Sequence, residues 1–107
     1  MADVPLFVYG TLLDEARLRS IVGRLFASVP ARLDGFRREP GAAGYPTVVP
    51  CPGESVTGLL LHDVDPDALR ALDAYEDEGR LYARQPATVH VDGRAVACQL
   101  YVALPRR

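Results

Sequence analysis

The sequence contains no lysine, because all 12 of its basic side chains are arginine. This absence excludes Schiff-base catalysis, covalent attachment of pyridoxal phosphate and the lysine of a phosphate-binding P-loop. Asparagine is also absent, which removes N-glycosylation sites and a Cys-His-Asn catalytic set. Any reaction on this chain therefore has to proceed without a lysine nucleophile.

Cysteine and excess charge are scarce as well. Cys51 and Cys98 are the two cysteines, and they do not form a CxxC pair. Isolated cysteines predict reduced thiols, and with no basic, apolar leader at the N-terminus they favour a cytoplasmic location. The formal net charge is only -2, and like charges do not cluster. We therefore expect neither a nucleic-acid nor a membrane partner.

The patterns that could bind metal are incomplete. Asp63-x-Asp65-x-Asp67 begins like a calcium loop, but alanine stands where such a loop needs its glycine and its last glutamate. His62 and His90 lack the spacing of a ligand pair. We expect no metal site and no cofactor.

The length of 107 residues and the apolar content of 49% predict one domain over residues 1–107. Apolar runs and turn signals predict elements in the order β-α-β-β-α-β-β, at residues 6–9, 14–25, 29–37, 55–62, 65–76, 82–91 and 94–103. Residues 39–53, rich in proline and glycine, predict a loop in which Thr47-Val48-Val49 could pair briefly. Asp92-Gly93 indicates a hairpin. The fold class is α+β, a small mixed barrel of five to six β-strands with two main helices.

The turn Tyr9-Gly10-Thr11-Leu12 is the first place that could carry chemistry, because it joins a buried strand to a helix. Backbone N–H groups at such a junction are unpaired and can bind a carboxylate or phosphate. Glycine at position 10 would let a ligand approach the main chain closely. In the alternative interpretation, Gly10 only makes a tight turn and Tyr9 packs in the core.

Glu76 is the second place. At about 100° per residue from Leu69, Leu72 falls near about 300° and Glu76 near about 340°, so the glutamate lies on the apolar stripe of its helix. Burial, the negative end of the helix and neighbouring aspartates would raise its pKa, as in a general base. In the alternative interpretation, Glu76 points into water or pairs with Arg80 or Arg84. The pair Arg37-Arg38 is expected to be a solvated edge.

Three motifs, in order, resemble those of the gamma-glutamylcyclotransferase-like family. Phe7-Val8-Tyr9-Gly10-Thr11-Leu12 is similar to its YGTL or YGSN signature, Leu72-Asp73-Ala74-Tyr75-Glu76 to its LDxxE motif, and Tyr82-Ala83-Arg84 to the YxR that follows. Gly44-Tyr45-Pro46, the strand Gly58-Leu59-Leu60 and a final strand ending near Tyr101 fall in the same order. The resemblance covers about residues 6–102, with the gamma-glutamylamine cyclotransferase-like branch as the best match.

This resemblance implies a closed mixed barrel with a cavity at one end and a reaction that converts a gamma-glutamyl amide to 5-oxoproline and a free amine. It implies that the backbone of Tyr9, Gly10, Thr11 and Leu12 binds the glutamyl carboxylate. Glu76 would be the general acid/base, and Tyr82 would form a wall of the pocket. The partner is then a small gamma-glutamyl substrate, and neither a metal nor a cofactor is needed.

Two departures from the family pattern leave a second function open. The family often has glycine directly after the catalytic glutamate, whereas this chain has Asp77-Glu78-Gly79. The chain is also short, which favours gamma-glutamyl amines with small or flexible leaving groups over glutathione. The alternative is a catalytically silent relative that binds a small carboxylate-bearing metabolite in the same cavity. A more distant one is a protein-interaction domain with a vestigial pocket. The sequence leaves the oligomeric state open.

Overall fold

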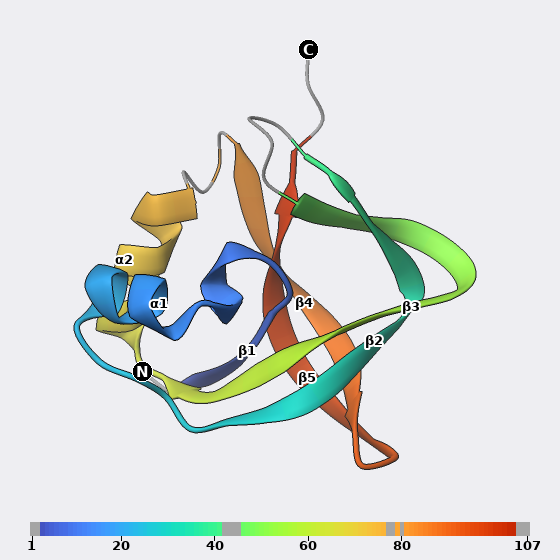
Figure 1. Cartoon of the computed structure of the whole chain (residues 1–107), viewed down its shortest axis with the longest axis horizontal. Helices are drawn as coiled ribbons and strands as arrows, with labels where there is room; N and C mark the ends of the chain where they lie inside the picture. The colour runs from blue at the N-terminus through green and yellow to red at the C-terminus, as the bar shows by residue number, and fades with distance from the viewer. Residues whose placement is uncertain (1–2, 42–45, 77–78, 80, 105–107) are drawn as a thin grey trace.

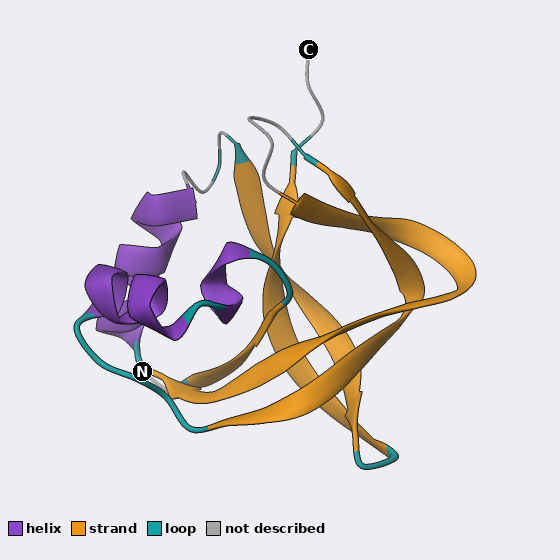
Figure 2. Cartoon of the chain, in the orientation of Figure 1, coloured by secondary structure: helices purple, strands orange, loops and turns teal. Residues whose placement is uncertain are grey.

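Two helices pack against one side of a five-stranded barrel in the computed structural model (Figure 1, Figure 2). The structure describes residues 3–41, 46–76, 79 and 81–104, and at Thr11 only the backbone. Its elements are β1 (Val4–Val8), the 3-10 helix η1 (Thr11–Leu13), α1 (Glu15–Val22), β2 (Ser28–Pro40), β3 (Pro46–Val64), α2 (Pro66–Glu76), β4 (Tyr82–Val91) and β5 (Arg94–Ala103). The predicted order and the α+β class are confirmed.

The strands close into a barrel in the order β1-β3-β2-β4-β5. Strand β1 closes the ring, because it pairs antiparallel with β3 and parallel with β5, where Leu6 lies beside Gln99. The other pairs are antiparallel. The barrel is therefore mixed, with five strands.

The loop predicted over residues 39–53 is wrong, because β2 and β3 extend through most of it. Residues 46–50 of β3 pair with residues 36–40 of β2 and, among the described strands, with no other. Proline has no N–H group to donate, and at an edge position no neighbouring strand requires one. This stretch therefore tolerates Pro46 and Pro50. The register shifts between Asp34 and Phe36 of β2, where residues 51–54 of β3 bulge outward.

Each α-helix begins within one residue of its predicted start. The Asp14 carboxylate accepts hydrogen bonds from the amides of Ala16 at 2.9 Å and Arg17 at 3.2 Å, as an N-cap does. Helix α1 ends at Val22, earlier than the predicted residue 25, because Gly23 has the left-handed φ of 81° that ends helices. At α2, the Asp65 carboxylate accepts from the amide of Ala68 at 3.3 Å.

The last two strands have the predicted bounds, and a two-residue turn joins them. Asp92 and Gly93 have φ values of 49° and 78°. Positive φ at both central residues is the requirement of a type I′ turn, whose twist matches that of the strands it joins. The Asp-Gly signal is therefore confirmed.

Strand β1 is buried on both faces and divides the core in two. Leu6 and Val8 point toward the helices and pack in a cluster with Leu18, Leu69 and Leu72. Phe7 and Tyr9 point the other way, into a second cluster inside the barrel that also contains residues of β2, β3, β4 and β5. Alternation of side chains along a strand produces this division.

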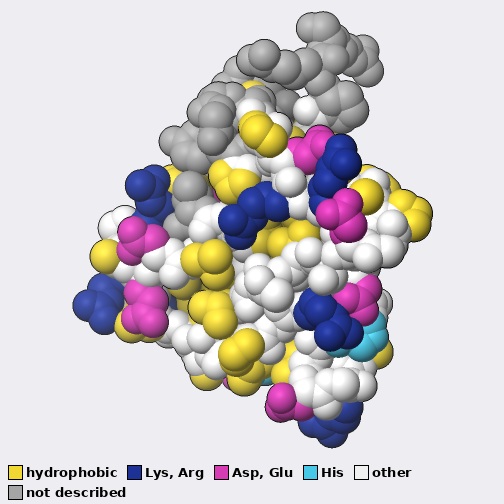
Figure 3. Space-filling view, turned by 45° about the vertical axis from the view of Figure 1, so that its right-hand side comes forward, with side chains coloured by type: hydrophobic (Ala, Val, Ile, Leu, Met, Phe, Trp, Pro, Cys, Tyr) yellow, Lys and Arg dark blue, Asp and Glu magenta, His cyan; other side chains and the backbone are white. Residues whose placement is uncertain are grey.

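The surface carries charges of both signs in close pairs. Arg32 lies 2.6 Å from Asp34, and Arg37 pairs with Glu39. Figure 3 shows basic and acidic side chains next to one another on the face that it draws. Among the described residues, neither α-helix is long and apolar enough to cross a membrane.

We expect Gly58→Ala to destabilise the barrel, because β1 occupies the space that a side chain at this position of β3 would need. A Cβ at position 58 would press on the carbonyl oxygen of Val8 and lie 2.9 Å from the Phe7 ring. Overpacking of this kind costs about 1–3 kcal/mol, measurable by urea unfolding. The exposed neighbour Thr57 supplies the control, Thr57→Val, with an expected effect within about 0.5 kcal/mol. Equal effects of the two substitutions would show that this seam is not tightly packed.

Candidate active site

A cavity opens where the end of β1 faces the end of α2. Its lining residues come from six elements or their ends, and they are Phe7, Val8, Tyr9, Gly10, Leu12, Pro46, Glu76, Tyr82 and Tyr101. Five of the six residues predicted for the site therefore share one cavity. The sixth, Thr11, begins η1, and its side chain lies outside the described part.

Glu76 is the last residue of α2 and is half-buried at the cavity. The stripe on which the sequence places it faces the core, since Leu69 is 8% and Leu72 0% exposed. Burial raises the pKa of Glu76 to about 7, because burial removes solvation from the charged form. Of the three predicted causes of a raised pKa, burial is therefore confirmed. Asp77, one of the predicted neighbours, lies outside the described residues.

Three buried tyrosines surround the same space. Tyr9, Tyr82 and Tyr101 are each 5% exposed or less. The Tyr9 hydroxyl donates to the carbonyl of Tyr101, and the Tyr82 hydroxyl donates to the carbonyl of Pro46 at 3.4 Å. Burial raises the pKa of Tyr9 and of Tyr101 far above the usual value. Tyr9 and Tyr101 therefore stay uncharged near pH 7, where Glu76 titrates.

The turn after β1 differs from the predicted junction. It does not enter α1 directly but forms the single turn η1, closed by a hydrogen bond of 3.0 Å from the Leu13 amide to the Gly10 carbonyl. Helix α1 begins only after Asp14, whose carboxylate already accepts from the first amides of that helix. The groups of this turn that could bind an anion are therefore its own amides, and not the first amides of α1.

Gly10 is required for packing. A Cβ at this position would lie 2.7 Å from Cγ of Pro46, at the start of β3. The Tyr9 carbonyl next to it accepts a hydrogen bond from the Arg38 guanidinium. Arg38 is therefore not simply a solvated edge residue, as the sequence predicted, because it ties β2 to the turn.

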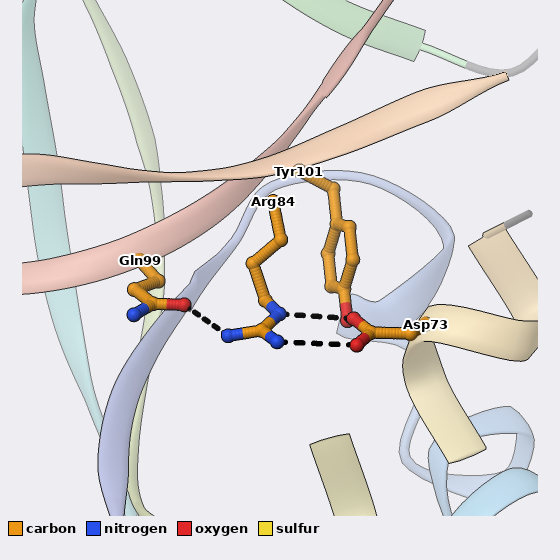
Figure 4. A network of polar contacts seen from close by, with 4 residues as sticks. All are labelled: Asp73, Arg84, Gln99 and Tyr101. Carbon is orange, nitrogen blue, oxygen red and sulfur yellow. Dashed lines mark hydrogen bonds and ion pairs between the residues drawn. The ribbon is translucent and has the colours of Figure 1, made fainter. Parts of the chain in front are cut away.

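A polar network joins α2 to the barrel beside the cavity (Figure 4). Arg84 on β4 donates to the Asp73 carboxylate from Nε at 2.9 Å and Nη2 at 3.1 Å, and its third nitrogen donates to Gln99. The Tyr101 hydroxyl donates to Asp73 at 2.6 Å. Burial raises the pKa of Asp73, but these bonds outweigh burial and hold it below the usual value.

The network connects two of the motifs. Asp73 of LDxxE and Arg84 of YxR bond to each other, whereas the alternative interpretation paired Arg84 with Glu76. Arg80, the other partner considered for Glu76, lies outside the described residues. Tyr101 was missed as a lining residue because its signal, an aromatic residue in a final apolar strand, also fits ordinary core packing.

The raised pKa of Glu76 predicts a pH-dependent effect of Glu76→Gln on stability. Between about pH 4.5 and 7 the folded protein keeps a proton on Glu76 that the unfolded chain has lost, so the contribution of Glu76 to stability falls as pH rises through this window. Glutamine has no such dependence. We expect the variant to gain stability relative to the native protein at pH 8 compared with pH 4, measured by urea unfolding at both. A Glu15→Gln control should show no such gain, and an equal gain in both variants would contradict burial as the cause.

The sequence and the fold both match known proteins. The family model described as "Gamma-glutamyl cyclotransferase, AIG2-like" matches residues 6–107. The chain is 32% identical over 72 residues to AIG2-like protein D of Arabidopsis thaliana, covering 66% of this chain and 47% of that protein. It is 29% identical over 98 residues to the "Gamma-glutamylcyclotransferase and putative RNase MJ0434" of Methanocaldococcus jannaschii, covering 90% and 44%.

A solution structure of an Arabidopsis thaliana protein has the same fold, with a TM-score of 0.84 and 28% identity over 97% of this chain and 70% of that one. The chain spans about half the length of the curated relatives it matches, at 47% and 44%. The family model nevertheless extends from Leu6 in β1 through β5. The chain belongs to the gamma-glutamyl cyclotransferase, AIG2-like family.

Proposed function

We propose that this protein is a gamma-glutamyl(amine) cyclotransferase, which converts a gamma-glutamyl amide to 5-oxoproline and a free amine with Glu76 as general acid/base. The observation that supports the proposal best is the position of Glu76, half-buried in the cavity that the Tyr9–Leu12 turn also lines. A carboxylate whose pKa lies at about 7 can accept and return a proton near neutral pH.

The substrate brings both reacting groups with it. Its alpha-amine attacks the carbonyl carbon of its own side-chain amide, a C–N bond forms to close the five-membered ring, and the C–N bond to the leaving amine then breaks. Two protons leave the alpha-ammonium nitrogen, which ends as the ring N–H, and two reach the departing nitrogen, which leaves as an ammonium group. Glu76 would accept each proton in turn and pass it on, so it ends the turnover in the state in which it began. The protein's other contribution is to hold the chain of the substrate folded, which is catalysis by positioning.

The backbone of Tyr9, Gly10, Thr11 and Leu12 would bind the glutamyl carboxylate. The support is geometric, because this turn stands at the end of β1, faces the same cavity as Glu76 and is tied in place by Arg38. Backbone N–H groups in a tight turn are suitable donors to an anion. Tyr82 would form a wall beside the substrate, because its ring lines the cavity and is 5% exposed.

The partner we propose is a small gamma-glutamyl compound free in the cytoplasm, with no metal or cofactor taking part. Among the described residues, no three of histidine, cysteine, aspartate and glutamate gather as a metal site would require. The leaving amine is the open part of the substrate. We propose small or flexible amines, as in the gamma-glutamylamine branch.

We expect the purified protein to release 5-oxoproline from at least one of a panel of gamma-glutamyl amides, gamma-glutamyl dipeptides and epsilon-(gamma-glutamyl)lysine, detected by mass spectrometry. Glu76→Gln should lower kcat by about 10²–10⁴-fold, the usual contribution of general acid–base catalysis, without loss of the fold. The exposed Glu15→Gln is the matched control and should retain full activity.

The alternative function gives a different result in the same experiment. A silent relative would bind gamma-glutamyl compounds or 5-oxoproline, seen by calorimetry, and release no product from any of them. Turnover that persists in Glu76→Gln would contradict the assignment of Glu76 even if the reaction itself is as proposed.

A further inference from the structure

We propose that Asp73 is a positioning residue for Glu76, and that Arg84 and Tyr101 hold Asp73 so that the last turn of α2 stays fixed over the cavity. This inference rests on the proposed function, because it concerns the residue proposed as acid/base. It assigns a role to a polar network that otherwise would be only a link between a helix and a sheet (Figure 4).

The first step is the position of Glu76 at a helix end. Helix α2 ends at Glu76 itself, and the last turn of a helix frays unless something outside the helix holds it. The apolar anchors Leu69 and Leu72 lie earlier on the helix and are buried. A catalytic carboxylate one turn beyond these anchors needs a further attachment to keep a fixed geometry.

The second step is that Asp73 supplies this attachment. It lies on α2 three positions before Glu76, and residues three apart on a helix are neighbours on its surface. Its carboxylate accepts two bonds from the Arg84 fork on β4 and one of 2.6 Å from the Tyr101 hydroxyl on β5. A bidentate arginine–carboxylate pair fixes orientation as well as distance.

The third step is that this ion pair is more sheltered than others on the same surface. The side chains of Arg84 and Asp73 are 25% and 26% exposed, whereas those of Arg70 and Asp67, also on α2, are 71% and 82% exposed. Water screens the second pair and competes for its bonds. The Asp73 pair is therefore suited to hold a helix turn, and the Asp67 pair is a natural control.

The fourth step is that the network reaches the cavity. Tyr101 lines the cavity together with Glu76, and its hydroxyl feels the charges of Asp73, Arg84 and Glu76. Among the described residues, the other titratable side chains that line this cavity are those of Tyr9, Tyr82 and Tyr101, and Tyr101 bonds to the Asp73 of the Asp73–Arg84 pair. If the pair loosens, the end of α2 becomes more exposed and the carboxylate of Glu76 is solvated again.

The experiment compares Asp73→Asn, Arg84→Lys and the control Asp67→Asn. Arg84→Lys keeps the positive charge and loses the fork, and Asp73→Asn keeps the shape and loses the charge. We expect both to lower kcat by about tenfold or more with KM within about threefold. By NMR titration of labelled glutamate, both should move the pKa of Glu76 from about 7 toward its ordinary value by about half a unit or more. Asp67→Asn should change neither.

A purely structural network would give another pattern. The Tm would fall in Asp73→Asn and Arg84→Lys, while kcat and the pKa of Glu76 stay as in the native protein, and this outcome overturns the proposal. Should either variant fail to fold, Tyr101→Phe removes one hydroxyl and leaves the ion pair, and it should shift kcat and the Glu76 pKa in the same directions.

The proposed function and this inference can fail separately. The NMR titration needs no substrate, so an inactive protein still tests whether Asp73 positions Glu76. If Glu76→Gln is inactive while Asp73→Asn keeps native kcat and a native Glu76 pKa, the reaction stands and the positioning role is wrong. If the Glu76 pKa responds to Asp73→Asn but no gamma-glutamyl compound is turned over, the positioning stands and the reaction is wrong.

Discussion

The position of strand β1 between β3 and β5 determines where the site forms. The strand is short, it is buried on both faces, and it closes the ring by pairing with one neighbour antiparallel and the other parallel. Close approach to β3 is possible because Gly58 has no side chain there. Because β1 is held in this way, the Tyr9–Leu12 turn that follows it has a fixed position at the cavity.

The last turn of helix α2 lies at the same cavity and carries two carboxyl groups whose pKa values are shifted in opposite directions. Asp73 is bonded to Arg84 and Tyr101, and these bonds hold its pKa below the usual value. Glu76, one turn further, is half-buried, and burial raises its pKa to about 7. The surroundings thus shift the pKa values of two acids on one helix in opposite directions. Asp73 remains a fixed charge, and Glu76 can exchange protons near neutral pH.

Much of this arrangement could be predicted because local rules decide it. Asp14, Asp65-Pro66 and Asp92-Gly93 are short-range signals, and the helices and the hairpin begin and turn where these residues stand. The apolar stripe through Leu69 and Leu72 placed Glu76 toward the core without knowledge of its neighbours. These predictions needed only contacts between residues close in the sequence.

The predictions that failed concern contacts between distant residues. The prolines of residues 46–52 indicated a loop, yet the edge position of this part of β3 accepts them, and no local pattern shows which strand is at an edge. The bond from Arg38 to the Tyr9 carbonyl and the bond from Arg84 to Asp73 join β2 to a turn and β4 to a helix. Their partners could not be chosen from the sequence, because several acidic groups and carbonyls were equally available to each arginine.

Contacts between distant residues also build the cavity itself. Each lining residue comes from a barrel strand, α2, η1 or the turn between β1 and η1, and these parts are fixed by pairing and packing within the domain. In the proposed function, the reacting half of a gamma-glutamyl substrate is the same whatever amine leaves, so a cavity fixed in this way would suffice for it.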